Sequence, residues 1–494
     1  MKKLIGLIAL CSVFSLSYSQ NSFSSGYYID GVFLSDMQGF SSARSTALAG
    51  AYSSLGGDLG AIGQNPAGIG VFRTSQFSFT PAFSSVNTNS TFSGQENTDF
   101  IYKMNLHNIG VNMNINTDNG SGWQCINLVL GYNQLANYSG SYKISGLTTG
   151  TSMANEFINF ANGSKVNDLN SYFEQLAYRL IVIDADSGST SYHSAYDNIP
   201  LKQQHTLEKN GSVGTYYFGM GTNYDHKLYL GFNFNIISGN YQYKTNHTEI
   251  DINDLITDNS FSFGYNLDTW VKGWNLGIGV IYRPIETLRL GLSIQTPSFI
   301  KITQETSTRM TATPDNGKTF VEVPTDEYGY ELGAMSESYD ITTPAKYTAG
   351  ISYLFEDKGL ISFDYEIEDF TKIKFSNSDY GADYFSTENS EMKDNMRIAQ
   401  TFRLGAEAKL NKFYLRGGCA YKQSPYSSGM LNSDAYTMLY AAGFGYNTGN
   451  TYIDFTYSLQ TVSENYLMYN HSALPKAELE TSSGKFLLTV GFKF

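Results

Sequence analysis

The segment LYLGFNFNI (residues 228–236) alternates bulky apolar residues with small or polar ones. Successive side chains of a β-strand point to opposite faces, so this segment predicts a strand with one apolar and one polar face. The apolar face would contact lipid in a transmembrane barrel and a protein core in a soluble β-sandwich. Alternation within one segment does not distinguish these two folds.

The same alternation recurs along the chain from residue 76 onward. Residues 126–132 and 288–294 show it as clearly as 228–236. The predicted strands number fourteen, and an even number is typical of bacterial single-chain barrels. They are 76–86, 104–116, 122–136, 213–223, 227–243, 273–283, 286–296, 345–355, 359–371, 400–410, 412–422, 437–447, 450–462 and 485–494.

The lengths of the connections between these strands decide between the two folds. Short turns, such as 224–226 and 284–285, alternate strictly with long connections. The long ones are 87–103, 137–212, 244–272, 297–344, 372–399, 423–436 and 463–484. Short turns at one end and long loops at the other are the pattern of outer-membrane barrels, and a soluble sandwich has no reason to keep it. The sequence therefore predicts an all-β fold, a transmembrane antiparallel barrel of about fourteen strands.

The two ends of the chain support an outer-membrane location. Residues 1–19 read as a secretory signal peptide, with Lys2 and Lys3 before a short apolar region and small residues at the cleavage site. The last strand, GKFLLTVGFKF (484–494), is amphipathic and ends at Phe494. Such a strand resembles the signal by which the barrel-assembly machinery recognises its substrates. The alternative is any exposed strand of a sheet.

Composition excludes several classes of partner and structure. The net charge of −13 makes nucleic acid an improbable partner, because binding to phosphates requires a basic surface. The 38 Tyr and 32 Phe supply too much apolar surface for a disordered chain.

The longest connection, 137–212, contains a helix-like piece at 169–183, which would either cover the barrel mouth or pack only on itself. Residues 389–399 also have helical character.

The segment that precedes the first strand, residues 20–72, does not alternate. Residues 41–54 are small and have helical character, and GQNPAGIGVF (63–72) forms an unusually apolar turn. A barrel of fourteen strands is wide enough to leave an open channel unless something fills it. We therefore expect a signal peptide at 1–19, a plug in the lumen at 20–72 and a transmembrane barrel at 73–494.

Four stretches of the chain resemble the FadL/TodX family of outer-membrane transporters for hydrophobic compounds. Asn65, Pro66 and Ala67 match the Asn-Pro-Ala turn of that family's hatch. The stretches are SARSTALAGAYSSLGGDLGAIGQNPAGIGVF (42–72), GWNLGIGVIYRPIETLRLGLSIQTPS (273–298), TPAKYTAGISYLFEDKGLISFDYEIEDF (343–370) and FYLRGGCAYKQSPY (413–426). The external loops depart from the family pattern.

The resemblance implies passive uptake through a plugged barrel in the bacterial outer membrane. A long-chain fatty acid or similar apolar molecule would pass the hatch and leave through the barrel wall into outer-membrane lipid. The hatch residues expected to line this passage are Asn65, Pro66, Ala67, Ile69, Val71 and Phe72; a purely structural turn is the alternative for the first three. No cofactor or metal is implied.

Cations in the lumen would suit a ligand with a carboxylate group. Strand parity points Arg289, Arg403 and Arg416 inward, but it also points Asp364, Glu366 and Glu407 inward, so pairing of these charges within the lumen is the stronger expectation. Two other functions stay open at this point: an adhesin-like barrel that acts through its long loops, and a haemin receptor, as some relatives have been called. No catalytic set of residues stands out, so an enzyme is not expected.

Overall fold

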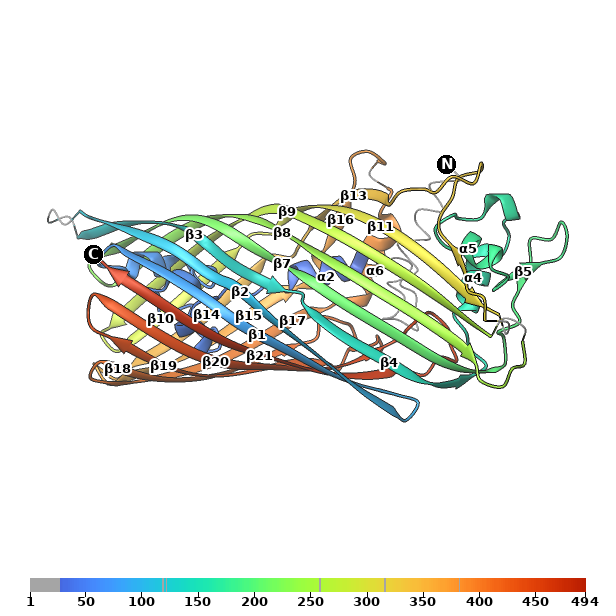
Figure 1. Cartoon of the computed structure of the whole chain (residues 1–494). Coiled ribbons are helices and arrows are strands. Elements are labelled where there is room, and N and C mark those ends of the chain that lie inside the picture. The colour runs from blue at the N-terminus through green and yellow to red at the C-terminus, as the bar shows by residue number, and fades with distance from the viewer. Residues whose placement is uncertain (1–26, 118–119, 121, 257–258, 315–316, 382) are drawn as a thin grey trace.

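The wall of the molecule is a closed barrel of fourteen antiparallel strands (Figure 1). Each strand pairs with its neighbours in sequence, and the first pairs with the last to close the ring. This confirms the predicted fold class. The wall strands are β1 (Gln76–Phe92), β2 (Gln95–Asn116), β3 (Trp123–Asn137), β7 (Pro200–Tyr224), β8 (Leu228–Asp251), β9 (Ser260–Ile285), β10 (Leu288–Gln295), β14 (Lys346–Leu354), β15 (Gly359–Asp369), β17 (Ile398–Leu410), β18 (Phe413–Gln423), β19 (Tyr436–Asn447), β20 (Thr451–Tyr466) and β21 (Ala477–Lys493).

The structure, a computed structural model, describes residues 27–494 except 118–119, 121, 257–258, 315–316 and 382. The predicted signal peptide and residues 20–26 of the predicted hatch lie outside the described residues. None of the described helices is both long and apolar enough to cross a membrane.

The outer face of the barrel is apolar and its lumen is polar. Along β8, Phe232, Phe234 and Ile236 are exposed, whereas Asn233 and Asn235 between them are buried. This is the arrangement expected of a barrel that faces lipid. The outward face of β21 has the predicted apolar residues Phe486, Leu488 and Phe492; recognition of this strand by the assembly machinery stays a prediction.

Five predicted long loops are partly wrong, because the ladders continue past the lipid-facing band. β7 begins at Pro200 and β21 at Ala477, within the predicted loops 137–212 and 463–484. β1 and β2 run through 87–103 and turn at Ser93 and Gly94, both with positive φ. β8 and β9 shorten the predicted loop 244–272, and 297–344 contains β11 (Phe299–Thr313), β12 (Phe320–Glu322) and β13 (Met335–Thr342). Outside the lipid band both faces of a strand are free to be polar, so the apolar period disappears although the backbone remains paired.

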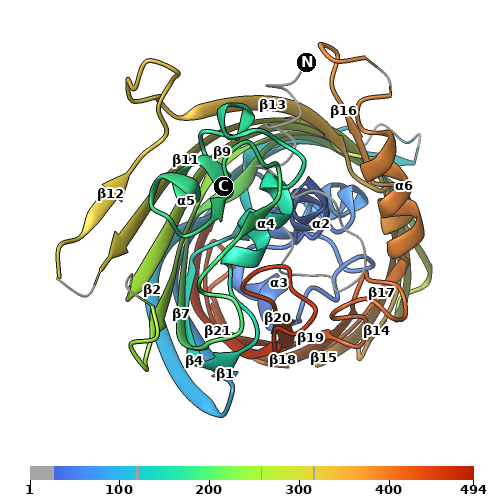
Figure 2. The same cartoon turned by 90° about the vertical axis from the view of Figure 1, so that its right-hand side faces the viewer.

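The long-loop end of the barrel is filled by chain from the loops. Figure 2 shows α2 and α4 inside the ring of strands. Phe157 of α4 packs against Phe173 and against Phe263 of β9, so the connection 137–212 covers the mouth of the barrel and does not pack only on itself. The elements at this end are β4 (Gly140–Thr149), α4 (Ala154–Ala161), η4 (Val166–Asp168), α5 (Glu174–Arg179), β5 (Asp184–Ala185), β6 (Tyr192–His193), η5 (Phe370–Lys372), β16 (Lys374–Ser376) and α6 (Ser386–Asn395).

Residues 27–72 lie inside the barrel and are called the plug below (Figure 1). The plug contains α2 (Tyr27–Ser35), α3 (Ala43–Ala47), η2 (Leu59–Ala61) and η3 (Pro66–Val71). Ser42 and Ser45 form a reciprocal capping box that starts α3. The helical segment predicted at 41–54 is therefore reduced to a single short helix, followed by Ala49 and Gly50 with positive φ.

Candidate functional site

The Asn-Pro-Ala turn holds the plug to the barrel wall through one side chain. Asn65 caps η3, since its Oδ1 accepts a hydrogen bond from the Ala67 N–H at 2.9 Å. Its Nδ2 lies 2.6 Å from the Ser53 carbonyl oxygen, 3.2 Å from that of Val280 and 3.3 Å from that of Leu292. A single buried amide thus links two parts of the plug to β9 and β10.

Glycines of the wall allow the turn to lie directly against the strands. A Cβ built on Gly231 would lie 2.1 Å from the Pro66 carbonyl oxygen, and one on Gly221 would lie 2.5 Å from the Gly70 N. No side chain fits between η3 and these strands, which is the close backbone approach that glycine permits.

The apolar residues of the predicted hatch are buried by this contact. Ala67 and Ile69 are fully buried and Phe72 nearly so, and Ile69 belongs to a cluster with Val129 and Tyr217 of the wall. Val71 is half-buried beside them. The structure therefore brings all six predicted hatch residues together against the wall; their contact with a passing molecule stays a prediction.

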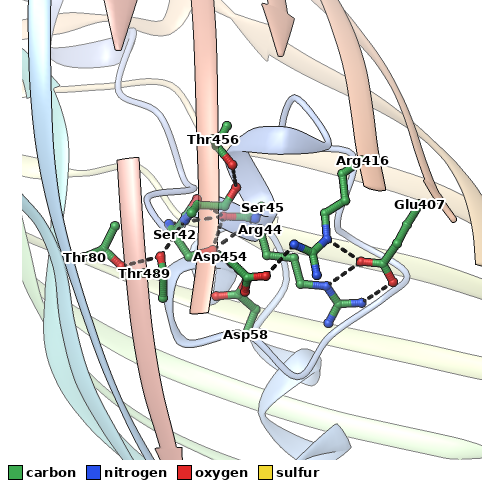
Figure 3. A network of polar contacts seen from close by, with 11 residues as sticks. Ser42, Arg44, Ser45, Asp58, Thr80, Glu407, Arg416, Asp454, Thr456 and Thr489 are labelled. Carbon is green, nitrogen blue, oxygen red and sulfur yellow. Dashed lines mark hydrogen bonds and ion pairs between the residues drawn. The ribbon is translucent and has the colours of Figure 1, made fainter. Parts of the chain in front are cut away.

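A network of charges fastens α3 to the opposite wall (Figure 3). Arg44 makes two 3.0 Å bonds to Glu407 of β17. Arg416 of β18 donates to the same carboxylate at 2.6 Å and to Asp454 of β20 at 2.5 Å. Since Glu407 and Arg416 are buried, removal of either partner would leave a buried charge without compensation.

Hydroxyl groups complete the attachment of α3. Thr489 of β21 accepts a hydrogen bond from the Ala43 N–H at 2.8 Å, and Thr456 of β20 donates to the Ala43 carbonyl at 2.6 Å. Ser42 donates to Asp58 within the plug at 2.6 Å. Residues 41–72, called the lower plug below, are therefore anchored on two sides, by α3 and by η3.

The three arginines predicted to face the lumen do so, and each has a partner inside. Arg403 donates to Glu366 at 2.7 Å, and Arg289 donates to the Leu55 carbonyl at 2.8 Å. Arg416 is paired with Glu407 and Asp454. This is the lumenal pairing expected from strand parity; a role of these arginines in ligand binding stays a prediction.

Between the lower plug and α2 lies a cavity of about 240 Å³, called the central cavity below. Plug residues 36–38 and residues 135–139 of the wall line it. Neither segment was predicted from the sequence to border a site. The only available signal was the loss of alternation after Gln134, where the chain reads QLANYSGS.

One wall of the central cavity is an interruption in the barrel, called the seam below. β2 pairs with β3 only from Asn108↔Asn133 to Asn116↔Cys125. Residues 95–106 of β2 pair with β1, and no strand in the described part of the chain pairs with their other edge. Opposite them β3 has a bulge between Gln134 and Ala136.

The seam lies at the depth of the lipid-facing band and is covered from both ends. Met104 and Leu106 on its β2 side are 78% and 37% exposed. Further along, Asn97 donates to Ser145 of β4 at 3.2 Å. From the lumen, the N–H of plug residue Gln38 donates to the Leu135 carbonyl at the bulge, at 3.1 Å.

The plug helix α2 is held in place by the buried carboxylate of its own residue Asp30. Asp30 accepts hydrogen bonds from Tyr339 at 2.6 Å and from Gln304 at 2.8 Å, and also from Tyr241. Lys346 donates to the Met37 carbonyl at 3.0 Å. The segment between α2 and α3 thus crosses the lumen from the seam to β14.

The connection 137–212, which covers the mouth of the barrel, is called the cap below. A cluster of polar side chains attaches it to the barrel. Glu249 of β8 accepts from the Met153 N–H at 2.7 Å and from Gln203 at 3.0 Å, and lies 3.1 Å from His247. His205 lies 3.1 Å from the Tyr466 hydroxyl. Both histidines are buried.

Comparisons with known proteins agree with this architecture. The family model described as outer membrane protein transport protein (OMPP1/FadL/TodX) matches residues 31–494. Curated protein sequences show no match.

Solved structures share the fold at low sequence identity. The Pseudomonas putida toluene transporter TodX is 11% identical, with a TM-score of 0.53 over 92% of this chain and 100% of that one. A Pseudomonas aeruginosa FadL homologue is 12% identical, with a TM-score of 0.53 over 93% and 100%. The Ralstonia pickettii toluene transporter TbuX is 14% identical, with a TM-score of 0.51 over 92% and 99%. The family match extends over nearly the whole chain, and the protein therefore belongs to the OMPP1/FadL/TodX family of outer-membrane transport proteins.

Proposed function

We propose that this outer-membrane transporter carries hydrophobic compounds passively, through the central cavity and then sideways through the seam into the membrane. Long-chain fatty acids or similar apolar molecules are the proposed substrates. The protein belongs to a family of transport channels and is not an enzyme. Burial of apolar surface, roughly 25 cal/mol per Å², would drive binding without any other energy source.

The observation that carries this proposal is the break in the β2–β3 ladder beside the central cavity. An unpaired strand edge at membrane depth is costly unless protein covers it. Here the plug supplies part of the cover, through the bond from Gln38 to Leu135. Breaking that bond would free the seam without unpairing any strand of the barrel.

The contacts of the plug suggest that some of its segments anchor it to the wall and that another segment moves. Both η3 and α3 are fixed by buried side-chain hydrogen bonds and ion pairs, whereas 36–40 borders the cavity and is held to the wall by the backbone bonds of Met37 and Gln38. We infer that the Asn-Pro-Ala turn anchors the plug and that 36–40 is the part that moves when a molecule passes.

The two alternative functions receive less support from the structure. His205 and His247 are buried and already have partners, so they are poorly placed to bind haemin iron. The connection 137–212, which an adhesin would present to a partner, is largely used to fill the barrel mouth.

The test is uptake of labelled palmitate, hexadecanol and toluene by cells that express the protein, compared with cells that lack it. Ala136 lines the cavity at the seam, so A136W should lower uptake about tenfold or more by filling the exit. A406W is the matched control, because Ala406 is exposed on the outer face of β17, away from the seam.

Two outcomes would contradict the proposal in different ways. Equal uptake of all three compounds with and without the protein would exclude transport of these compounds. Protein-dependent uptake that A136W leaves at the wild-type rate would exclude the seam as the exit.

A further inference from the structure

A hollow of about 660 Å³ lies on the outer face of the barrel, where β9 changes its pairing partner. β9 pairs with β10 as far as Gly277 and with β11 from Trp274 onward, toward the long-loop end (Figure 1). Residues of β8, β13 and β16 complete the lining of this hollow, which is called the outer hollow below. It shares no lining residue with the central cavity.

A row of apolar side chains borders the outer hollow on the side of the lipid-facing band. The ladders place Ile236 of β8 opposite Trp274 of β9, and Trp274 opposite Phe299 of β11. All three are exposed, and the ring centroids of Trp274 and Phe299 lie 4.8 Å apart. Aromatic side chains mark the level at which hydrocarbon meets head groups around a membrane barrel. The outer hollow therefore lies at the head-group level of the outer leaflet.

Two lysines lie directly opposite each other in the next row of the same face. Lys272 of β9 pairs with Lys301 of β11, each two residues beyond the aromatic row. Like charges directly opposite each other across a ladder are destabilising. Both lysines are exposed, and neither forms an ion pair or a side-chain hydrogen bond within the described residues. The lysine pair thus calls for an anion from outside the protein.

The rest of this row adds two hydroxyl groups and one carboxylate. Ser238 of β8 lies opposite Lys272, Asp340 of β13 lies opposite Lys301, and Ser376 of β16 follows Asp340. The lining therefore has two cations and one carboxylate, in a chain whose net charge is −13. Ammonium and hydroxyl groups are the donors that phosphate oxygens accept from.

Carboxylates further from the membrane restrict the level at which an anion can bind. Asp268 of β9 and Glu305 of β11 lie opposite each other, four residues beyond the lysine pair. A phosphate at that level would be repelled, and a phosphate nearer the membrane centre would enter the apolar band. The lysine pair is therefore at the favourable level for a phosphate.

We propose that the outer hollow binds a phosphorylated lipid of the outer leaflet, of the lipid A class, with a phosphate between Lys272 and Lys301 and acyl chains over the row from Ile236 to Phe299. The inference goes beyond the proposed transport function, because this lipid remains on the outer face and is not carried. A phosphate between the two ammonium groups replaces their repulsion with charge-assisted hydrogen bonds.

The dimensions of the two rows fit such a lipid. Two residues along a strand span about 7 Å, so a lipid whose chains cover the aromatic row places its head group at the lysines. Three neighbouring strands make the apolar row about 10 Å wide, which is enough for acyl chains side by side. A lipid with several chains and a phosphorylated head uses both rows at once.

The test uses the full-length protein in phosphatidylcholine nanodiscs that contain either diphosphoryl lipid A or its dephosphorylated form with the same acyl chains. Native mass spectrometry measures the lipid A that the ejected protein retains. Wild-type protein should retain about tenfold more of the diphosphoryl form. K272M/K301M should abolish this preference and leave retention of the dephosphorylated form unchanged, whereas K272R/K301R should keep the preference.

The matched control is K358M/K412M, which removes two exposed lysines from short turns at the other end of the barrel. It should keep the wild-type preference. W274A/F299A should lower retention of both forms of lipid A equally, because it removes the surface under the acyl chains and leaves the lysines in place.

Several outcomes would overturn the proposal. Equal retention of the two forms by wild-type protein, which needs no variant, would exclude a phosphate site. Equal losses in K272M/K301M and K358M/K412M would show that only overall charge matters. Displacement of lipid A by excess inorganic phosphate would reduce the lysine pair to a site for free anions, and equal retention of phosphatidylglycerol would reassign it to phospholipids.

Discussion

At the scale of single residues, buried polar side chains decide where the plug sits. Glu407 illustrates this, because one carboxylate holds Arg44 of the plug and Arg416 of the wall together. Asn65 does the same for η3 with an uncharged amide. Such groups have large effects when removed, since their partners remain buried in the lumen.

The first prediction concerns Asn65. In N65A the Ser53, Val280 and Leu292 carbonyls lose their shared donor, and Ala67 loses its cap. We expect the plug to be destabilised relative to the barrel by about 1–3 kcal/mol. The measurement is hydrogen–deuterium exchange, which should become faster in the plug and stay unchanged in the strands.

N65D separates the two roles of this side chain. It keeps the oxygen that caps η3 and loses the NH₂ group that reaches the wall, so it should resemble N65A. An N65D plug that exchanges as slowly as wild type would show that the bonds to the wall contribute little.

At the scale of elements, the ladders and the cap helices follow different physical rules. The strands are visible in the sequence wherever they touch lipid, as β8 and β10 do. The helix α4 is determined by packing, because Phe157 and Ala161 are buried among residues from distant strands. Glu156 of α4 is only 2% exposed, and burial raises the pKa of the Glu156 carboxyl group to about 8.

The second prediction follows from this carboxyl group. The folded cap holds the proton of Glu156 more tightly than the unfolded chain does, so the stability of the cap is greatest below the ordinary pKa of 4.5 and falls as pH rises to about 8. Exchange of α4 amides, corrected for the intrinsic pH effect, should therefore be faster at high pH. E156Q should remove this dependence.

The control for E156Q is D168N, since Asp168 of η4 is exposed in the same connection. D168N should keep the wild-type pH dependence. If wild type and E156Q respond equally to pH, Glu156 is not the group responsible.

At the scale of the whole molecule, transport depends on a wide barrel that must stay closed to water and ions. Fourteen strands enclose a lumen that would conduct if it were empty. The lower plug closes it by lying against the wall on both sides, through η3 on β7–β9 and α3 on β17–β21. The conductance of ions through the barrel should therefore rise when the plug lies less closely against the wall.

The third prediction uses this relation. In G231A the new Cβ would lie 2.1 Å from the Pro66 carbonyl oxygen, so η3 must move away from the wall. We expect the variant to show ion-conducting openings in planar bilayers more often than wild type. G264A is the control, because the nearest atoms to its Cβ are 3.6 Å away. Equal conductance of G231A and wild type would mean that η3 does not contribute to closure.

The sequence predicted the parts of the structure that depend on contact with lipid or on local backbone chemistry. The alternation in 228–236 and its repeats, together with the alternating loop lengths, indicated the barrel, and Asn65-Pro66-Ala67 indicated the hatch turn. The loops at 87–103, 137–212, 244–272, 297–344 and 463–484 were partly mispredicted, because strands that leave the lipid band lose their apolar period. The inward direction of Arg289, Arg403 and Arg416 followed from parity alone.

Only the tertiary structure decided which lumenal charges are neutralised and where the wall is open. Parity gives the face of a strand but not the distance across the lumen, so it could not pair Arg403 with Glu366. The seam depends on where β3 leaves β2, and the contact of Gln38 with Leu135 joins residues far apart in the chain. The sequence thus determined a plugged outer-membrane barrel through local periodicity, whereas the site depends on non-local contacts that periodicity does not encode.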